Sequence, residues 1–244
     1  LVLKGGKTSA GARAVVSHTG RMAGEHEVWQ AMMRQAGVIE LTGLTDLLVT
    51  LQAWRSAELR PHNRSDGGVM VIGCGGGISV LISDALVAAN LSVAKLGPGT
   101  LSALKQLEPA AKVLGGIDNP IEMPVDRLFS DPTKLARLIK TSATDPEVGM
   151  VLVHLNLIAF SDLFGADNLA HLEAICTAIR DVAGCIAKPL TVVLRNGDCG
   201  QTTEKLYHSA VTSLGSQGGL DIFRDLEPAL AWLGRVRTFT SRQS

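Results

Sequence analysis

The sequence predicts an α/β protein whose main part is a doubly wound parallel sheet. Runs of continuous apolar residues alternate with helical patterns along most of the chain, and this alternation is interrupted once, by a polar stretch over residues 56–68. Continuous apolar runs are typical of strands covered by helices on both faces, and strands that alternate with helices form parallel sheets. We therefore expect two α/β units, over residues 1–62 and 63–244.

The first unit is predicted to hold two strands and two helices. Its first helix is supported by the apolar pairs Val28/Met32 and Trp29/Met33 at i, i+4 spacing and by Gly37, which is expected to end it. Two strands are too few for an independent domain, so residues 1–62 are predicted to be the C-terminal part of another α/β domain. The predicted elements are strands over 1–3 and 38–41, a loop over 7–24, and helices over 25–36 and 44–54.

The second unit repeats the strand and helix alternation often enough for a complete domain. Its first helix is so apolar that burial on most sides is expected. The pattern predicts a flavodoxin-like, doubly wound domain over residues 63–244. The predicted strands cover 69–72, 91–96, 148–155, 190–194 and 221–223; the predicted helices cover 78–89, 100–107, 132–141, 168–182, 202–214 and 226–233; and a loop is predicted over 115–124.

Composition excludes several classes of function. Lys and Arg total 23 and Asp and Glu total 23, so the chain has no excess charge for binding nucleic acid or an anionic membrane. The longest uncharged run, over 67–83, is too short and too rich in glycine for a membrane span. The four cysteines form no CxxC pair, so we expect no metal site and a reducing, cytoplasmic location. Because the chain begins inside a strand-like run without Met, we expect a fragment of a longer protein.

The strongest candidate site is the stretch GARAVVSHTGRMAG over residues 11–24. His18 stands between two hydroxyl residues and before two glycines, in a predicted strand-to-helix loop. Exposed backbone N–H groups at a helix N-terminus bind phosphate, and a neutral imidazole can attack phosphorus. The alternative is a structural role, in which the His18 side chain hydrogen-bonds to a backbone carbonyl of the loop. The residues concerned are Ser17, His18, Thr19, Gly20 and Gly24, with Arg13 and Arg21 as nearby cations.

A second candidate is the glycine turn over residues 73–78, which reads GCGGGI. It departs from GxGxxG and lacks the GK[ST] of a P-loop, so it does not support dinucleotide or Walker-type nucleotide binding. A helix N-terminus behind clustered glycines favours anion binding, and a tight strand-to-helix turn is the alternative.

Other polar residues are weaker candidates. His26 is predicted to be a solvated helix residue, and His154 a buried core histidine, although His154 and Asn156 end a strand at the edge where such sheets bind ligands. Arg195 at the end of the next strand could approach an anion, but an ion pair is the simpler expectation. Asp198 and Cys199 in the NGDCG loop are typical of turns.

Several separated motifs make the chain resemble the NDP-forming acyl-CoA synthetases, a branch of the succinyl-CoA synthetase superfamily. Residues 1–54 carry GARAVVSHTGRMAG followed by RQAGVIEL, in the order of the family's phosphohistidine segment. The resemblance continues with VMVIGCGGGISVLISDAL, DNPIEM and LDIFRDLEPALAWLGRV, so it covers essentially the whole chain.

The resemblance implies a role for particular residues. His18 matches the histidine that is transiently phosphorylated, and two helix N-termini from two α/β domains face the phosphorylated histidine in the superfamily. The implied phosphate-binding residues are Ser17, Thr19, Gly20, Gly24, Gly75, Gly76 and Gly77, and the supporting residues are Arg21, Glu25 and Asn119. Arg21, Met22, the GCGGGIS turn and the Ile121–Glu122 pair depart from the family pattern.

The implied reaction is acid + CoA + ATP ⇌ acyl-CoA + ADP + phosphate. CoA, ATP/ADP and Mg²⁺ are implied for the full-length enzyme, held by a CoA-binding domain and an ATP-grasp domain that this chain lacks. The implied substrate is a small carboxylic acid, and exposed apolar surface on the truncated first unit could support a homodimer. The alternative is a non-catalytic regulatory or assembly module of the same fold that binds an acyl-CoA, a nucleotide or a partner chain.

Overall fold

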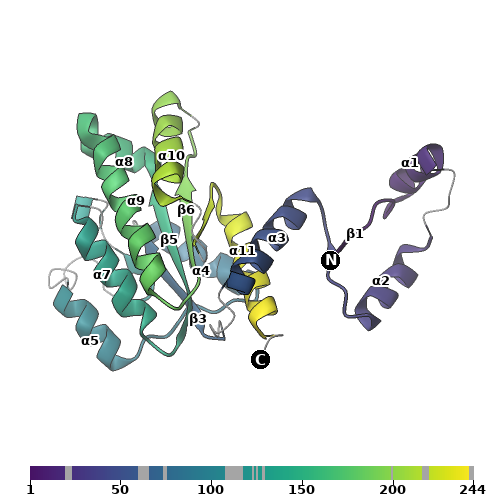
Figure 1. Ribbon diagram of the computed structural model, residues 1–244, viewed down its shortest axis with the longest axis horizontal. Helices are drawn as coiled ribbons and strands as arrows, with labels where there is room; N and C mark the ends of the chain where they lie inside the picture. The colour runs from purple at the N-terminus through teal and green to yellow at the C-terminus, as the bar shows by residue number, and fades with distance from the viewer. Residues whose placement is uncertain are drawn as a thin grey trace. The chain divides into compact units, whose positions relative to one another are not determined.

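The computed structural model describes two compact units, Leu1–Leu51 and Gln52–Ser244, each of which is considered by itself. Figure 1 labels their helices and strands along the chain. The predicted domain boundary between residues 62 and 63 lies outside the described residues and remains a prediction. The described residues are 1–19, 24–59, 66–73, 76–107, 118–122, 124, 126–127, 130–198, 200–215 and 220–241.

The first unit is built on two short parallel strands. Val2 pairs with Glu40 and Leu3 with Leu41. Lys7 holds the second strand, because its Nζ lies 2.8 Å from Glu40 Oε1 and donates to the Leu41 carbonyl at 3.1 Å. The elements are β1 (Val2–Leu3), α1 (Ser9–Thr19), α2 (His26–Gln35), β2 (Glu40–Leu41) and α3 (Leu44–Leu59), which runs on into the second unit.

The predicted loop over residues 7–24 is wrong for its central part, which is the helix α1. Thr8 starts this helix: its hydroxyl accepts from the Gly11 N–H at 3.1 Å, and its carbonyl accepts from the Ala12 N–H at 2.8 Å. A threonine at this position caps a helix, and the alanines that follow favour one. The glycines and hydroxyl residues that suggested a loop are therefore accommodated within a helix.

The end of α2 is as the sequence predicts. Gly37 has a φ of +63°, and its N–H donates to the Arg34 carbonyl at 3.2 Å. A glycine in this left-handed conformation is a common helix stop. The apolar residues Val28 and Met32 on α2 are 60% and 54% exposed, so in the described structure they lie outside the core.

The second unit is a five-stranded parallel sheet in the order β4-β3-β5-β6-β7. Numbered along this unit, that order is 2-1-3-4-5, which is the flavodoxin-like arrangement. The predicted flavodoxin-like fold is therefore confirmed. The strands are β3 (Gly68–Gly73), β4 (Ile121–Glu122), β5 (Val148–Asn156), β6 (Leu190–Arg195) and β7 (Leu220–Phe223).

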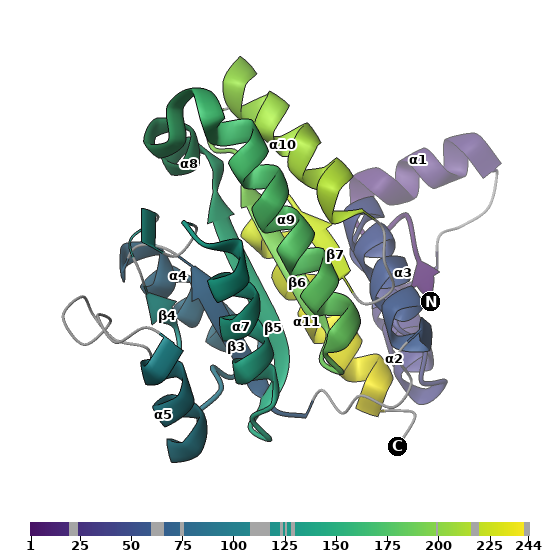
Figure 2. The same ribbon diagram turned by 60° about the vertical axis from the view of Figure 1, so that its left-hand side comes forward.

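Helices cover both faces of this sheet, as Figure 2 shows. In one layer each helix contacts the next helix of that layer. In the other layer α4 contacts α11. The residues of β3 and most of β5 are fully buried between the layers, as is Trp232 of α11. The first layer comprises α5 (Pro98–Leu107), α7 (Pro132–Ala143), α9 (Asn168–Cys185) and α10 (Gln201–Leu214); the second comprises α4 (Gly76–Ala88) and α11 (Leu226–Ser241).

Two predictions in this unit are wrong in detail, and one helix is missing from the predicted elements. The expected strand over 91–96 is a single bridge between Val69 and Val93. The expected loop over 115–124 contains β4 in its described part. The helix α8 (Leu157–Phe164), followed by the turn Gly165–Asp167, was not expected because it begins directly at the end of β5. Among the described residues, no helix is both long and apolar enough to cross a membrane.

Candidate functional site

His18 lies in the last turn of α1, where its side chain is exposed. The neighbouring Ser17 hydroxyl donates to the Ala14 carbonyl of the same helix at 2.8 Å. The C-terminal end of a helix presents carbonyl groups and a partial negative charge. The donors that a phosphoryl group on His18 would need must therefore come from other segments than α1.

The N-terminus of α2 is part of the first predicted anion site. Gly24 precedes it with a φ of +68° and open space around its Cα. Glu25 is the N-cap residue, and its side chain makes no capping hydrogen bond, so it leaves the first N–H groups of α2 without a partner from that residue. The other predicted members of this site, Gly20 and Arg21, lie outside the described residues, as does the side chain of Thr19.

The N-terminus of α4, in the unit Gln52–Ser244, is the second predicted anion site. Strand β3 ends at Gly73 and α4 begins at Gly76. A side chain added at Gly77 would meet nothing within 4 Å, and the first turn of α4 carries no acidic residue. The first turn of α4 therefore has no carboxylate of its own, which favours binding of an anion at its N–H groups. Gly75 lies outside the described residues.

Asn119 holds the edge of β3. Its Oδ1 accepts from the Val71 N–H at 2.9 Å, and its Nδ2 donates to the carbonyls of Val69 at 2.9 Å and Ala94 at 2.8 Å. Both donors of the amide are thus used by the backbone. These contacts give Asn119 a structural role, and its supporting role in phosphate binding stays a prediction.

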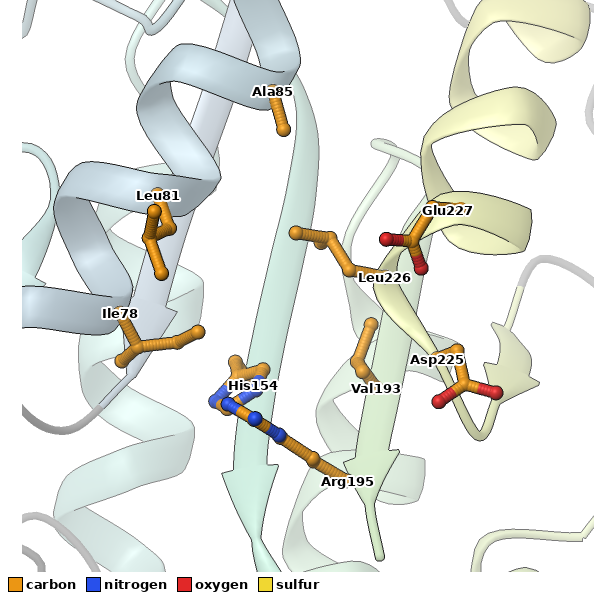
Figure 3. Close-up of a pocket in the computed structure, with 9 residues that line it drawn as sticks. All are labelled: Ile78, Leu81, Ala85, His154, Val193, Arg195, Asp225, Leu226 and Glu227. Carbon is orange, nitrogen blue, oxygen red and sulfur yellow. The ribbon is translucent and has the colours of Figure 1, made fainter. Parts of the chain in front are cut away.

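A pocket of about 400 Å³ opens at the carboxyl edge of the sheet in the second unit. This is the edge where doubly wound folds bind ligands. Its polar lining residues are His154 at the end of β5, Arg195 at the end of β6, and Asp225 and Glu227 at the start of α11 (Figure 3). Its apolar lining residues are Ile78, Leu81, Ala85, Val193 and Leu226.

The two basic residues of this pocket are close together and differ in burial. His154 is 2% exposed, and its Nδ1 has no hydrogen-bond partner among the described residues. Burial, and secondarily the positive charge of Arg195, lowers the pKa of His154 to about 4, so its imidazole is neutral at pH 7. Arg195 is exposed, and it forms no ion pair within the part of the chain that the structure describes.

The acidic side of the pocket comes from the segment between β7 and α11. In Figure 3 the carboxylates of Asp225 and Glu227 lie on the opposite side of the pocket from His154. The Arg195 side chain extends toward His154. Neither carboxylate has an ion pair with another described residue. The sequence pattern indicates His154 and Arg195 as candidates but does not indicate the two acids. The signal for them was the polar RDLE stretch directly after a predicted strand.

The remaining weak candidates have local structural roles. Asn156 caps α8, because its Oδ1 accepts from the Ile158 N–H at 3.1 Å. Asp198 accepts from the Gly200 N–H at 3.1 Å and from the Thr203 hydroxyl at 2.6 Å, which is the turn chemistry predicted for it. Cys199 lies outside the described residues. No group of three or more His, Cys, Asp or Glu side chains in the described ranges is arranged to hold a metal ion.

Comparison with known proteins confirms the resemblance to the NDP-forming acyl-CoA synthetases. Residues 1–54 match the family model of the succinyl-CoA ligase like flavodoxin domain. The chain is 26% identical over 206 residues to the alpha subunit of the ADP-forming acetate–CoA ligase II of Pyrococcus furiosus, covering 84% of this chain and 42% of that subunit. It is 29% identical over 177 residues to the ADP-forming acetate–CoA ligase I of Archaeoglobus fulgidus, covering 72% of this chain and 24% of that protein.

A solved structure shares the fold. It is the acetyl-coenzyme A synthetase 1 of Ca. Korarchaeum cryptofilum in complex with phosphate and ADP, with a TM-score of 0.66 and 19% sequence identity, covering 99% of this chain and 47% of that one. The chain therefore spans less than half of the length of each of these proteins.

Proposed function

We propose, taking this similarity to ADP-forming CoA ligases as the premise, that the chain is a fragment of an NDP-forming acyl-CoA synthetase. The full-length enzyme would catalyse acid + CoA + ATP ⇌ acyl-CoA + ADP + phosphate, and His18 would carry the phosphoryl group between half-reactions. The observation that supports this most strongly is the exposed His18 within the segment that the family model matches. An exposed imidazole is free to meet two different partners in turn.

The chemistry assigned to His18 is nucleophilic. A neutral imidazole nitrogen attacks the phosphorus of an acyl phosphate, an N–P bond forms, and the bond between phosphorus and the acyl oxygen breaks. The carboxylate leaves with the electron pair. In the second half-reaction the phosphoryl group passes from His18 to a nucleoside diphosphate.

The phosphoryl group on His18 needs hydrogen-bond donors and positive potential. The N-termini of α2 and α4 have those properties, because the Glu25 side chain does not cap the first and no carboxylate occupies the first turn of the second. Backbone N–H groups at a helix N-terminus stabilise phosphoryl oxygens without a counter-charge. We propose that these two helix N-termini, together with the predicted phosphate-binding residues, bind the phosphoryl group on His18 in the two half-reactions.

CoA, ATP and Mg²⁺ belong to other parts of the proposed enzyme. The described residues include no group of three or more His, Cys, Asp or Glu side chains that could hold a metal ion. CoA would bind to a CoA-binding domain and ATP to an ATP-grasp domain, and the substrate would be a small carboxylic acid. The protein would act in the cytoplasm, as a homodimer.

The proposal is tested by assaying the full-length protein for acid-dependent release of ADP in the presence of CoA and ATP. His18→Ala should abolish turnover, because the phosphoryl group has no carrier. His208→Ala, which removes an exposed imidazole on α10, is the matched control and should retain most of the activity. Equal activity of the wild type and His18→Ala would refute the role of His18. Nucleotide binding without turnover in the wild type would favour the non-catalytic module.

A further inference from the structure

The pocket between α4 and α11 has a lining that the phosphoryl-transfer chemistry of His18 does not use. Its size suits a small molecule, since ligand pockets begin at about 300 Å³. It lies wholly within the unit Gln52–Ser244. Its charged groups stand on two sides, with Arg195 and His154 at the strand ends and Asp225 and Glu227 at the start of α11.

The residues on the strand side of the pocket favour the binding of an anionic group. Arg195 is a cation without an ion pair among the described residues. Beside it, His154 is almost wholly buried and still has an Nδ1 atom without a hydrogen-bond partner in the described structure. Leaving a buried polar atom unpaired is costly, so a ligand that satisfies it gains affinity. A carboxylate can accept from both Arg195 and a neutral imidazole.

The residues on the helix side of the pocket favour the binding of a cationic group. Asp225 and Glu227 bring two negative charges against the single positive charge of Arg195, so a simple anion would meet net repulsion. An ammonium group facing the two acids removes that repulsion. Between the charged sides, Ile78, Leu81 and Val193 provide an apolar wall, and Leu81 is 61% exposed.

We propose that this pocket binds a zwitterionic aminocarboxylate with an apolar body. Its carboxylate lies at Arg195 and His154, its ammonium group at Asp225 and Glu227, and its hydrocarbon part against α4. This assignment is independent of His18 and goes beyond the proposed ligase reaction.

The experiment is calorimetric titration of the 244-residue chain with matched six-carbon probes. 6-Aminohexanoate and norleucine carry both charges, at different separations; hexanoate carries only the carboxylate, and hexylamine only the ammonium group. At least one of the two zwitterions should bind about tenfold more tightly than either singly charged probe, because each charged contact adds a charge-assisted hydrogen bond. Absence of saturable binding by both zwitterions, or equal binding of hexanoate, would overturn the proposal.

Variants separate the two sides of the pocket. Arg195→Gln should lower the affinity of the zwitterion to that of hexylamine, and the double variant Asp225→Asn/Glu227→Gln should lower it to that of hexanoate. Asn and Gln keep the size of the replaced side chains, so the start of α11 should be kept. The controls Lys140→Gln and Asp162→Asn change the same charges on α7 and α8 and should leave binding unchanged.

A spectroscopic measurement tests the part assigned to His154. The ¹⁵N resonances of its imidazole should shift when the zwitterion binds and should stay in place when hexylamine is added. Unchanged resonances at saturation with the zwitterion would contradict a contact with His154.

Discussion

At the scale of the residue, Asn119 makes the clearest structural prediction. Asn119→Ala removes the partners of the Val71 N–H and the Ala94 carbonyl. Two partly buried backbone groups left unpaired should lower the free energy of unfolding by about 2 to 4 kcal/mol. The measurement is urea denaturation followed by circular dichroism. Asn119→Asp places a carboxylate oxygen against the carbonyls of Val69 and Ala94, so it should be at least as destabilising as alanine; an unchanged midpoint for Asn119→Ala would contradict the role.

His154 predicts a pH dependence. Its folded pKa of about 4 lies below the ordinary value of 6.5, because burial and Arg195 disfavour the protonated form. The unfolded chain therefore binds this proton first as the pH falls, and stability is lost between about pH 6.5 and pH 4. The contribution is at most about 3 kcal/mol, since each unit of pKa corresponds to about 1.4 kcal/mol.

The test is titration of His154 by NMR together with urea denaturation at several pH values. His154→Gln, which does not titrate, should show a smaller loss of stability over the same pH range. A His154 resonance that titrates near pH 6.5 would contradict the burial argument.

Residue-scale features differ in how far sequence can predict them. His18 stood out because hydroxyl residues and glycines surround it, and Arg195 because it ends an apolar strand. Asp225 and Glu227 did not stand out, because acidic residues at a helix start are ordinary in any sequence. Only the fold shows that these acids and His154, far apart in the chain, line one pocket.

At the scale of the element, α7 shows how one side chain starts a helix. Asp131 Oδ1 accepts from the backbone N–H groups of Thr133 at 2.9 Å and Lys134 at 3.2 Å, and Pro132 opens the helix. Asp131→Ala should cost about 1 kcal/mol, the usual value of an N-cap. Thermal unfolding measures it, and Asp131→Ser, which can also cap, should recover most of the loss. A loss with serine equal to that with alanine would argue against capping.

The elements themselves were predictable where they are long and regular. The strands β3, β5 and β6 and the helices α7, α9 and α10 lie close to their predicted positions because each has a sustained apolar pattern. Short or irregular elements were not predictable: α1 depends on a cap at Thr8, and β4 is two residues whose pairing with β3 is a tertiary contact. Local pattern carries no information about such contacts.

At the scale of the whole molecule, the two units should differ in local stability. The sheet of the first unit has two strands of two residues each, whereas β3, β5 and β6 of the second unit are almost wholly buried. A two-stranded sheet is marginally stable, and protection from hydrogen exchange follows buried, cooperative structure. The amides of β1 and β2 should therefore exchange much faster than those of β5. Hydrogen exchange with mass spectrometry measures this, and equal protection would contradict the difference.

The central claim is that His18 carries a phosphoryl group, and intact mass spectrometry of the full-length protein tests it most directly. After incubation with ATP and Mg²⁺ and without an acid substrate, wild type and the control His208→Ala should each gain one acid-labile phosphate, and His18→Ala should gain none. A phosphate that persists in His18→Ala, or the absence of phosphate from wild type that binds nucleotide, would contradict the account.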